Sequence, residues 1–197
     1  SSGIYLYQSS NNTLSNNSCY LNSVDGIVLE SSSNNTISNN NCYSNPFYGI
    51  YLLSSSNNTI TNNSCYSNVE VGIYLEGSSN NIISNNSCYS NNPTGIYLGI
   101  NSNNNTISNN NFYSNAWGIN IESSINNTFV NCELGKSGNN TAGDIFPWGY
   151  TSITLKNCNL YLVYSNETVI GVFAFKDVDK KVEVTPMIVL ADHQHKG

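Results

Sequence analysis

The chain has 197 residues, a formal net charge of −6 and only 9% charged residues, against about 25% in an ordinary soluble domain. Asn and Ser, with 39 and 30 residues, replace the missing charged residues. The six basic residues are all Lys and are too few to form the basic face that nucleic-acid binding requires, so this class of protein is excluded. The longest apolar run, residues 169–175, is too short to cross a membrane, and 14 Tyr, 6 Phe and 2 Trp argue against disorder.

From its first residues the chain is built of a repeat. Each unit opens with a Gly-Ile-x-Leu phrase and holds three short β-prone pieces separated by Asn and Ser turns. No helical spacing of apolar residues occurs, and each piece is too short to be stable alone, so stacking of units must bury the apolar side chains. The opening glycines recur every 23 residues, at Gly3, Gly26, Gly49, Gly72, Gly95 and Gly118.

Three short strands per 23 residues predict an all-β parallel β-helix of about six coils with a β-rich C-terminal cap or extension. Equivalent residues of successive coils then form ladders about 4.8 Å apart, with one inner ladder running from Ile4 to Ile119. Asn residues recur at the turns, where they adopt left-handed backbone and bond one another between coils. These Asn ladders are interpreted as structural.

Cysteines follow the same register. Cys19, Cys42, Cys65 and Cys88 are 23 residues apart and Phe112 takes the fifth place, which favours free, buried thiols over disulfides between coils. Cys132 and Cys158 lie outside this ladder and are disulfide candidates, a pairing that the sequence leaves open.

The phrase G-I-x-L-x-x-S-S-N-N-T-I-S-N-N-x-C-Y-S-N resembles the repeat of NosD-like proteins and of the carbohydrate-binding and sugar-hydrolase, pectate-lyase-like β-helix family. The resemblance covers residues 1–132 and implies a right-handed β-helix of the Asn/Ser-rich type found in surface proteins of archaea. The repeat is a specific indicator of the fold but only a weak indicator of activity. The remaining residues, 133–197, form a second predicted segment, namely a loop and a β-rich cap or subunit-contact segment.

Residues 1–132 contain no Lys, Arg or His, and their acidic residues form no tight pair. Glu30, Glu76 and Glu122 recur in alternate coils, roughly 10 Å apart, too far for a metal cage and marginal for two hydrolytic carboxylates. They are interpreted as solvated charges that discourage aggregation. The sequence therefore predicts no catalytic residue, no metal site, no cofactor and no enzyme. Asp192, His193 and His195 are potential metal ligands, but their place near the end of the chain favours a tail.

Two stripes of tyrosine are the candidate ligand-binding residues, since aromatic side chains contact sugars or a second subunit. The alternative is that Tyr simply favours exposed strand positions. One stripe comprises Tyr5, Tyr51, Tyr74 and Tyr97, and the other Tyr20, Tyr43, Tyr66, Tyr89 and Tyr113.

Asn-x-Ser/Thr sequons are glycan acceptors if the protein is secreted and the asparagine is exposed, and some of them are expected to be modified. They begin at Asn11, Asn16, Asn34, Asn57, Asn62, Asn85, Asn104, Asn126, Asn139 and Asn166.

The sequence thus predicts a non-catalytic structural β-solenoid of the cell surface or extracellular space. Because the first coil opens without a cap, head-to-tail stacking into a filament, sheath or stalk is expected, with copies of itself or other surface proteins as partners. The alternative is a carbohydrate-binding or polysaccharide-degrading protein, with glycans as the partner.

Overall fold

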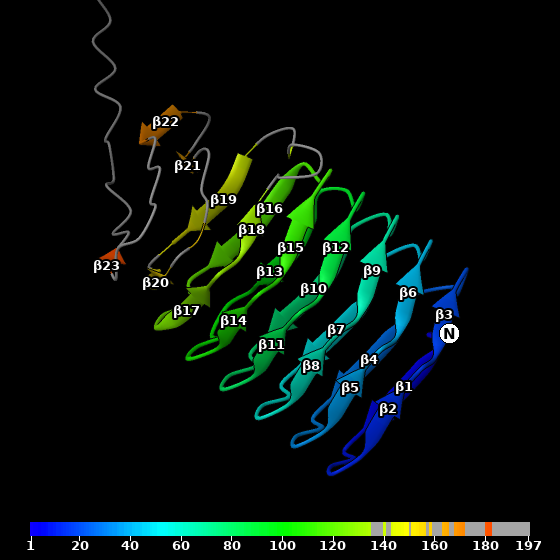
Figure 1. The fold of residues 1–197 in the computed structure, drawn as a ribbon. Coiled ribbons are helices and arrows are strands. Elements are labelled where there is room, and N and C mark those ends of the chain that lie inside the picture. Colours follow the sequence, from blue (N-terminus) through cyan, green and yellow to red (C-terminus); the bar gives the residue numbers. More distant parts are fainter. Residues whose placement is uncertain are drawn as a thin grey trace, which may run out of the picture.

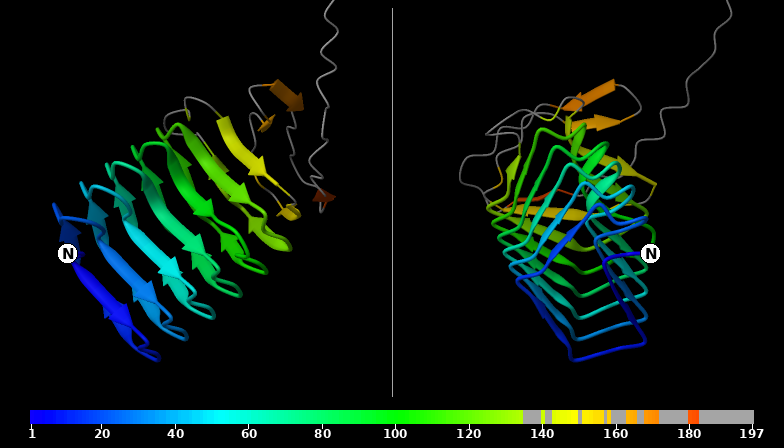
Figure 2. Two further views of the ribbon diagram at one scale, coloured as in Figure 1. Left: turned by 180° about the vertical axis from the view of Figure 1, so that it is seen from behind. Right: turned by 90° about the vertical axis from the view of Figure 1, so that its right-hand side faces the viewer.

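The structure is a computed structural model that describes residues 1–134, 140, 143–149, 151–156, 158, 163–165, 168–171 and 180–182. Over these residues it is all β, without helix, and the predicted right-handed parallel β-helix is confirmed. Successive coils lie one above the next in Figure 1, and the right-hand view of Figure 2 looks along the stack. No described helix could span a membrane.

Three parallel sheets form the sides of the solenoid, because each coil contributes one strand to each sheet. In order within its sheet, sheet A contains β1 (Ile4–Tyr7), β4 (Ile27–Glu30), β7 (Ile50–Leu53), β10 (Val71–Glu76), β13 (Thr94–Leu98), β16 (Trp117–Glu122), β19 (Gly143–Trp148), β21 (Val163–Ser165) and β22 (Thr168–Gly171). Sheet B contains β2 (Thr13–Ser15), β5 (Thr36–Ser38), β8 (Thr59–Thr61), β11 (Ile82–Ser84), β14 (Thr106–Ser108), β17 (Asn127–Val130), β20 (Ile153–Lys156) and β23 (Lys180–Val182). Sheet C contains β3 (Ser18–Tyr20), β6 (Asn41–Tyr43), β9 (Ser64–Tyr66), β12 (Ser87–Tyr89), β15 (Asn111–Tyr113) and β18 (Glu133–Leu134).

The register between coils places like residues on like residues. Ile27 pairs with Ile50 and Leu29 with Leu52, and these inward side chains are fully buried. Cys42, Cys65 and Cys88 form a buried column that Phe112 continues, and they are free thiols in the structure. Inward apolar side chains from all three sheets therefore form one continuous core along the axis.

Three buried asparagine ladders fix the turns. In the ladder through Asn63, its Oδ1 accepts from the backbone N (2.9 Å) and Nδ2 (3.0 Å) of Asn40, in the preceding coil. Its Nδ2 donates to Asn86 Oδ1 in the next coil (3.0 Å) and to Ile37 O (2.9 Å). Each amide thus satisfies backbone groups that no strand ladder could reach, which buried turns require.

Eight sequon asparagines that the structure describes lie at the residue before a ladder Asn. All eight are exposed and have left-handed φ near 60°, a conformation that Asn tolerates. Their glycosylation stays a prediction, and their side chains are sterically open to it. They are Asn11, Asn16, Asn34, Asn57, Asn62, Asn85, Asn104 and Asn126; the candidates Asn139 and Asn166 lie outside the described residues.

Beyond residue 132 the strands β18, β19 and β20 add to sheets C, A and B in parallel, continuing the solenoid. β21 and β22 pair antiparallel, and β23 pairs antiparallel with β20. The sequence predicts further strands over residues 169–175 and 182–191. Most of both segments lies outside the described residues, as do Asp192, His193 and His195. The assignment of residues 133–197 to a cap stays a prediction, as does head-to-tail association.

Candidate functional site

The outer surface of sheet A gathers aromatic and acidic side chains, and we call it the tyrosine–glutamate face. In register along this surface run Tyr5, Val28, Tyr51, Tyr74, Tyr97 and Asn120. Val28 is buried although it points outward, between two tyrosines of the register. The face is defined by Tyr5, Tyr48, Tyr51, Tyr74, Tyr97, Asp25, Glu30, Glu70, Glu76 and Glu122.

Aromatic stacking orders the centre of this face. The rings of Tyr51 and Tyr74 stack with centroids 5.1 Å apart, and those of Tyr74 and Tyr97 with centroids 4.8 Å apart. Tyr48 lies against Tyr51 (5.0 Å) and meets Tyr74 edge to face (4.9 Å). Because stacked rings cover each other's faces, a ligand meets mainly their edges and hydroxyls.

Each glutamate of alternate coils accepts a hydrogen bond from a tyrosine of the coil before it. Tyr51 Oη donates to Glu76 Oε2 (2.9 Å), and Tyr74 Oη reaches the same oxygen (3.3 Å). Glu30 and Glu122 accept from Tyr5 and Tyr97 in the same way. Tyrosine hydroxyls thus hold these glutamates against the sheet, and their interpretation as solvated charges that discourage aggregation stays a prediction.

Burial and the neighbouring carboxylates raise the pKa values of the tyrosine hydroxyls at the centre of this face. Burial, followed by the Glu76 carboxylate, raises the pKa of Tyr51 well above its ordinary value. Burial and the Glu70 carboxylate raise the pKa of Tyr48 to about 12. A phenol held protonated beside a carboxylate serves as a hydrogen-bond donor at neutral pH.

Asp25 is the buried carboxyl of this region, with 5% of its surface exposed. Its Oδ1 accepts from the backbone N of Tyr48 (3.1 Å) and its Oδ2 from Ser2 Oγ (3.4 Å). Burial nonetheless dominates and raises the pKa of Asp25 above its usual 3.8. Ionised Asp25 therefore opposes folding at neutral pH.

This shift predicts the pH dependence of stability. A carboxyl with a raised pKa in the folded state contributes stability below its unfolded pKa, and that contribution is lost as pH rises through the folded pKa. We expect Asp25→Asn, which keeps an acceptor for Tyr48 N, to remove this loss. Thermal unfolding of both proteins between mildly acid and neutral pH measures it; a parallel pH dependence in the two proteins would contradict the prediction.

The second tyrosine stripe forms a separate ladder on sheet C. Its rings stack with centroids 4.8–4.9 Å apart and interplanar angles of 3–5°. The ladder comprises Tyr20, Tyr43, Tyr66, Tyr89 and Tyr113. Ser64, Ser87 and Asn111 share its strands, so the strands that carry this ladder contain no carboxylate; Glu133 of sheet C follows one coil later, in register with Asn111.

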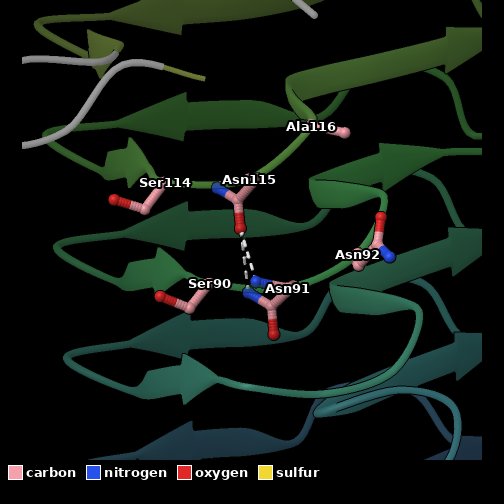
Figure 3. Close-up of a pocket in the computed structure, with 6 residues that line it drawn as sticks. All are labelled: Ser90, Asn91, Asn92, Ser114, Asn115 and Ala116. Atoms are coloured by element: carbon pink, nitrogen blue, oxygen red, sulfur yellow. Dashed lines mark hydrogen bonds between the residues drawn. The ribbon is translucent and has the colours of Figure 1, made fainter. Parts of the chain in front are cut away.

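A polar pocket of about 280 Å³ lies at the turns that join sheets C and A. It is lined by Ser90, Asn91, Asn92, Ser114, Asn115 and Ala116. Figure 3 shows Asn91 of this pocket hydrogen-bonded to Asn115 Oδ1, through both its backbone N (2.9 Å) and its Nδ2 (3.3 Å). These amides are members of a structural ladder, so the pocket offers little that is free for a ligand.

Cys132 and Cys158 are both buried and lie within hydrogen-bonding reach of each other, which lowers the pKa of the Cys158 thiol. They are free thiols in the structure. Cys132 Sγ also donates to Ile107 O at 3.4 Å. Formation of a disulfide between this pair stays a prediction.

The sequence analysis missed Tyr48, Asp25 and Glu70 as members of the face. The available signal was register: Tyr48 occupies the place of Asp25 one coil later, immediately before the opening glycine. A second signal was the constant 25-residue offset between each tyrosine and its glutamate, as in Tyr51 and Glu76.

Residues 2–160 match the family described as the right-handed β-helix region, and the chain belongs to this family. No curated protein matches it. Among solved structures it is similar to the periplasmic alginate epimerase AlgG, with 20% identity and a TM-score of 0.65 over 84% of this chain and 44% of that one. The A-module of Azotobacter vinelandii mannuronan C-5 epimerase AlgE6 gives 19% identity and a TM-score of 0.65 over 79% and 46%.

The Dettilon tailspike protein is also similar, with 20% identity and a TM-score of 0.65 over 80% of this chain and 36% of that one. The chain thus spans less than half the length of each of these proteins. The likeness shows a shared fold, one found in proteins that act on polysaccharides.

The prediction that the chain is not an enzyme is contradicted by these comparisons, because the epimerases among the similar structures are enzymes. That prediction relied on the missing basic residues and the wide spacing of glutamates. It overlooked that the fold brings tyrosine hydroxyls onto those glutamates, and that one fold supports many sites.

Proposed function

We propose that this chain is a carbohydrate-binding β-solenoid that takes a polysaccharide along the tyrosine–glutamate face. The observation that carries the proposal is the row of tyrosine hydroxyls hydrogen-bonded to glutamates of the next coil, from Tyr5 to Glu30, Tyr51 to Glu76 and Tyr97 to Glu122. Phenol and carboxylate groups present donors and acceptors side by side, as sugar hydroxyls require. The family, whose fold occurs in alginate and mannuronan epimerases, supports the same class of ligand.

The solenoid geometry suits a polymer. Tyrosine–glutamate hydrogen bonds recur in every second coil, roughly 10 Å apart, so an extended glycan along the axis meets the same chemistry repeatedly. Each contact is weak in water, but several together give useful affinity. A location outside the cytoplasm, at the cell surface or in the extracellular space, accords with this ligand and with the periplasmic and tailspike proteins of similar fold.

The test is binding of an oligosaccharide panel to the purified chain and to Tyr74→Ala. Tyr74 contacts three aromatic rings of the face, so its removal is expected to weaken binding about tenfold or more. Tyr66→Ala is the matched control, because Tyr66 stacks equally well but on sheet C. Calorimetry gives the affinities, and NMR of the same samples reports whether the bound sugar is chemically changed.

Equal losses in the two variants would locate the site elsewhere or reflect a general change in stability. Thermal unfolding of both variants separates these two outcomes. No binding by the unsubstituted chain to any glycan of the panel would overturn the proposed function.

A further inference from the structure

The charge on the tyrosine–glutamate face selects among glycans. All five acidic residues of the first six coils, Asp25, Glu30, Glu70, Glu76 and Glu122, belong to this one face. The sequence provides no Lys, Arg or His anywhere in residues 1–135 to neutralise them. A negative potential over one side of the solenoid therefore attracts cations and repels anionic polymers.

The carboxylates retain accepting capacity. A carboxylate offers about four lone-pair sites, and tyrosine hydroxyls reach Glu76 at one oxygen, Oε2. A ligand that adds donors and positive charge makes charge-assisted hydrogen bonds there, which are roughly twice as strong as neutral ones.

Two further acceptors lie in the same strands. Asn120 continues the tyrosine register directly after Tyr97, and its Oδ1 is buried without a hydrogen-bond partner in the described structure. Thr94 lies on the neighbouring strand and is 1% exposed, and its Oγ1 likewise has no partner there. Unsatisfied acceptors beside carboxylates fit a ligand rich in N–H and O–H groups.

The spacing of the glutamates matches a polymer that carries charged groups at regular intervals. Glu30, Glu76 and Glu122 recur in every second coil and so lie roughly 10 Å apart along the axis. An extended β-1,4-linked glycan repeats every two sugars over a comparable length, which returns its substituents to the same side. Successive glutamates can then meet amino groups of alternate sugars without bending the chain.

From these observations we infer that the tyrosine–glutamate face selects a polysaccharide carrying free, protonated amino groups, and discriminates against uronic-acid polymers. This inference rests on the proposed function and deepens it by naming the substrate class. It places the ammonium groups against Glu30, Glu76 and Glu122, with tyrosine hydroxyls contacting the neighbouring sugar oxygens.

The experiment compares two hexasaccharides that differ only at the amino group: β-1,4-linked glucosamine, whose amines are free and charged, and its N-acetylated form, whose amides are neutral. At mildly acidic pH, where the amines are protonated, we expect the amino form to bind the intact chain about tenfold more tightly. Raising the salt concentration should weaken binding of the amino form alone, since screening acts on charge. An oligomannuronate is the anionic comparison and should bind least.

Two substitutions test whether the charge of the tyrosine–glutamate face causes the preference for the amino form. Glu76→Gln keeps the shape and an acceptor for Tyr51 and Tyr74 but removes the charge, and should reduce binding of the amino hexasaccharide several-fold while leaving the acetylated form unchanged. Glu133→Gln is the control, because it removes an equal charge from β18 of sheet C.

The outcomes separate the two proposals. Equal binding of both hexasaccharides, with Glu76→Gln without effect, overturns the inference and leaves glycan binding intact. Tighter binding of the uronate overturns it as well. Binding of none of the three, when another glycan of the panel does bind, overturns the inference alone; a lack of binding to every glycan overturns the proposed function itself.

Discussion

Replacement of Gly72 by Ala is expected to destabilise the solenoid by about 3 kcal/mol or more. A Cβ at this position would lie 2.6 Å from Gly95 O, 2.9 Å from Asn91 Nδ2 and 3.0 Å from Cys88 Cβ. The first contact is with backbone of the next coil, which cannot move without breaking the strand register. The opening glycine of each repeat is therefore required by the close approach of successive coils.

Gly77→Ser is the matched control, since Gly77 is five residues away and a Cβ there meets nothing closer than Ser54 Oγ at 3.7 Å. The equivalent residue one coil earlier is Ser54, which already has a left-handed φ of 50°, against 56° for Gly77. Urea unfolding followed by circular dichroism gives both free energies. A loss for Gly72→Ala no larger than that for Gly77→Ser would contradict the steric explanation.

Replacement of Asn63 by Ala is expected to cost about 2–5 kcal/mol of unfolding free energy. It removes the acceptor of the backbone N–H of Asn40 and one donor to Ile37 O, both inside the stack. Water cannot reach these groups, since Asn40 and Asn63 are at most 2% exposed. The cost arises from orphaned backbone groups in addition to the lost side-chain volume.

Asn62→Gly tests this explanation at the neighbouring residue. Asn62 is exposed and has a φ of 56°, a conformation that glycine adopts readily, so its replacement should change stability by about 1 kcal/mol at most. Comparable losses in Asn62→Gly and Asn63→Ala would show that the ladder amides contribute no more than ordinary turn residues.

The fold could be predicted from the sequence because one constraint, the 23-residue period, fixes strand order, register and core together. Ile50 lies on Ile27 in the structure as the repeat requires. The turns were harder, because Asn62 and Asn63 are identical in type and only one is buried. Which Asn of a pair turns inward depends on the backbone φ angle, and the residue type alone does not determine that angle.

The site was predicted only in part for a related reason. The 23-residue period and the alternation of side chains predicted that Tyr51, Tyr74 and Tyr97 lie on one surface. They do not predict which group each tyrosine hydroxyl contacts. The hydrogen bond from Tyr51 to Glu76 joins positions that differ both in coil and in place within the strand. Such diagonal pairs depend on side-chain length and rotamer. Aligning the repeats compares only equivalent positions of successive coils, so it does not bring the two partners of a diagonal pair together.

The asparagine ladders also give the solenoid an electrical polarity. In the row that starts at Asn17, the side-chain oxygens of Asn40, Asn63 and Asn86 each accept from the coil before, so these amide dipoles point the same way. Rows through Asn45 and Asn58 repeat the arrangement at the other two turns. Aligned dipoles polarise one another and add along the axis, as peptide dipoles do in an α-helix. The stack accordingly has a negative pole toward its first coil and a positive pole toward its last, a directionality independent of its charged residues.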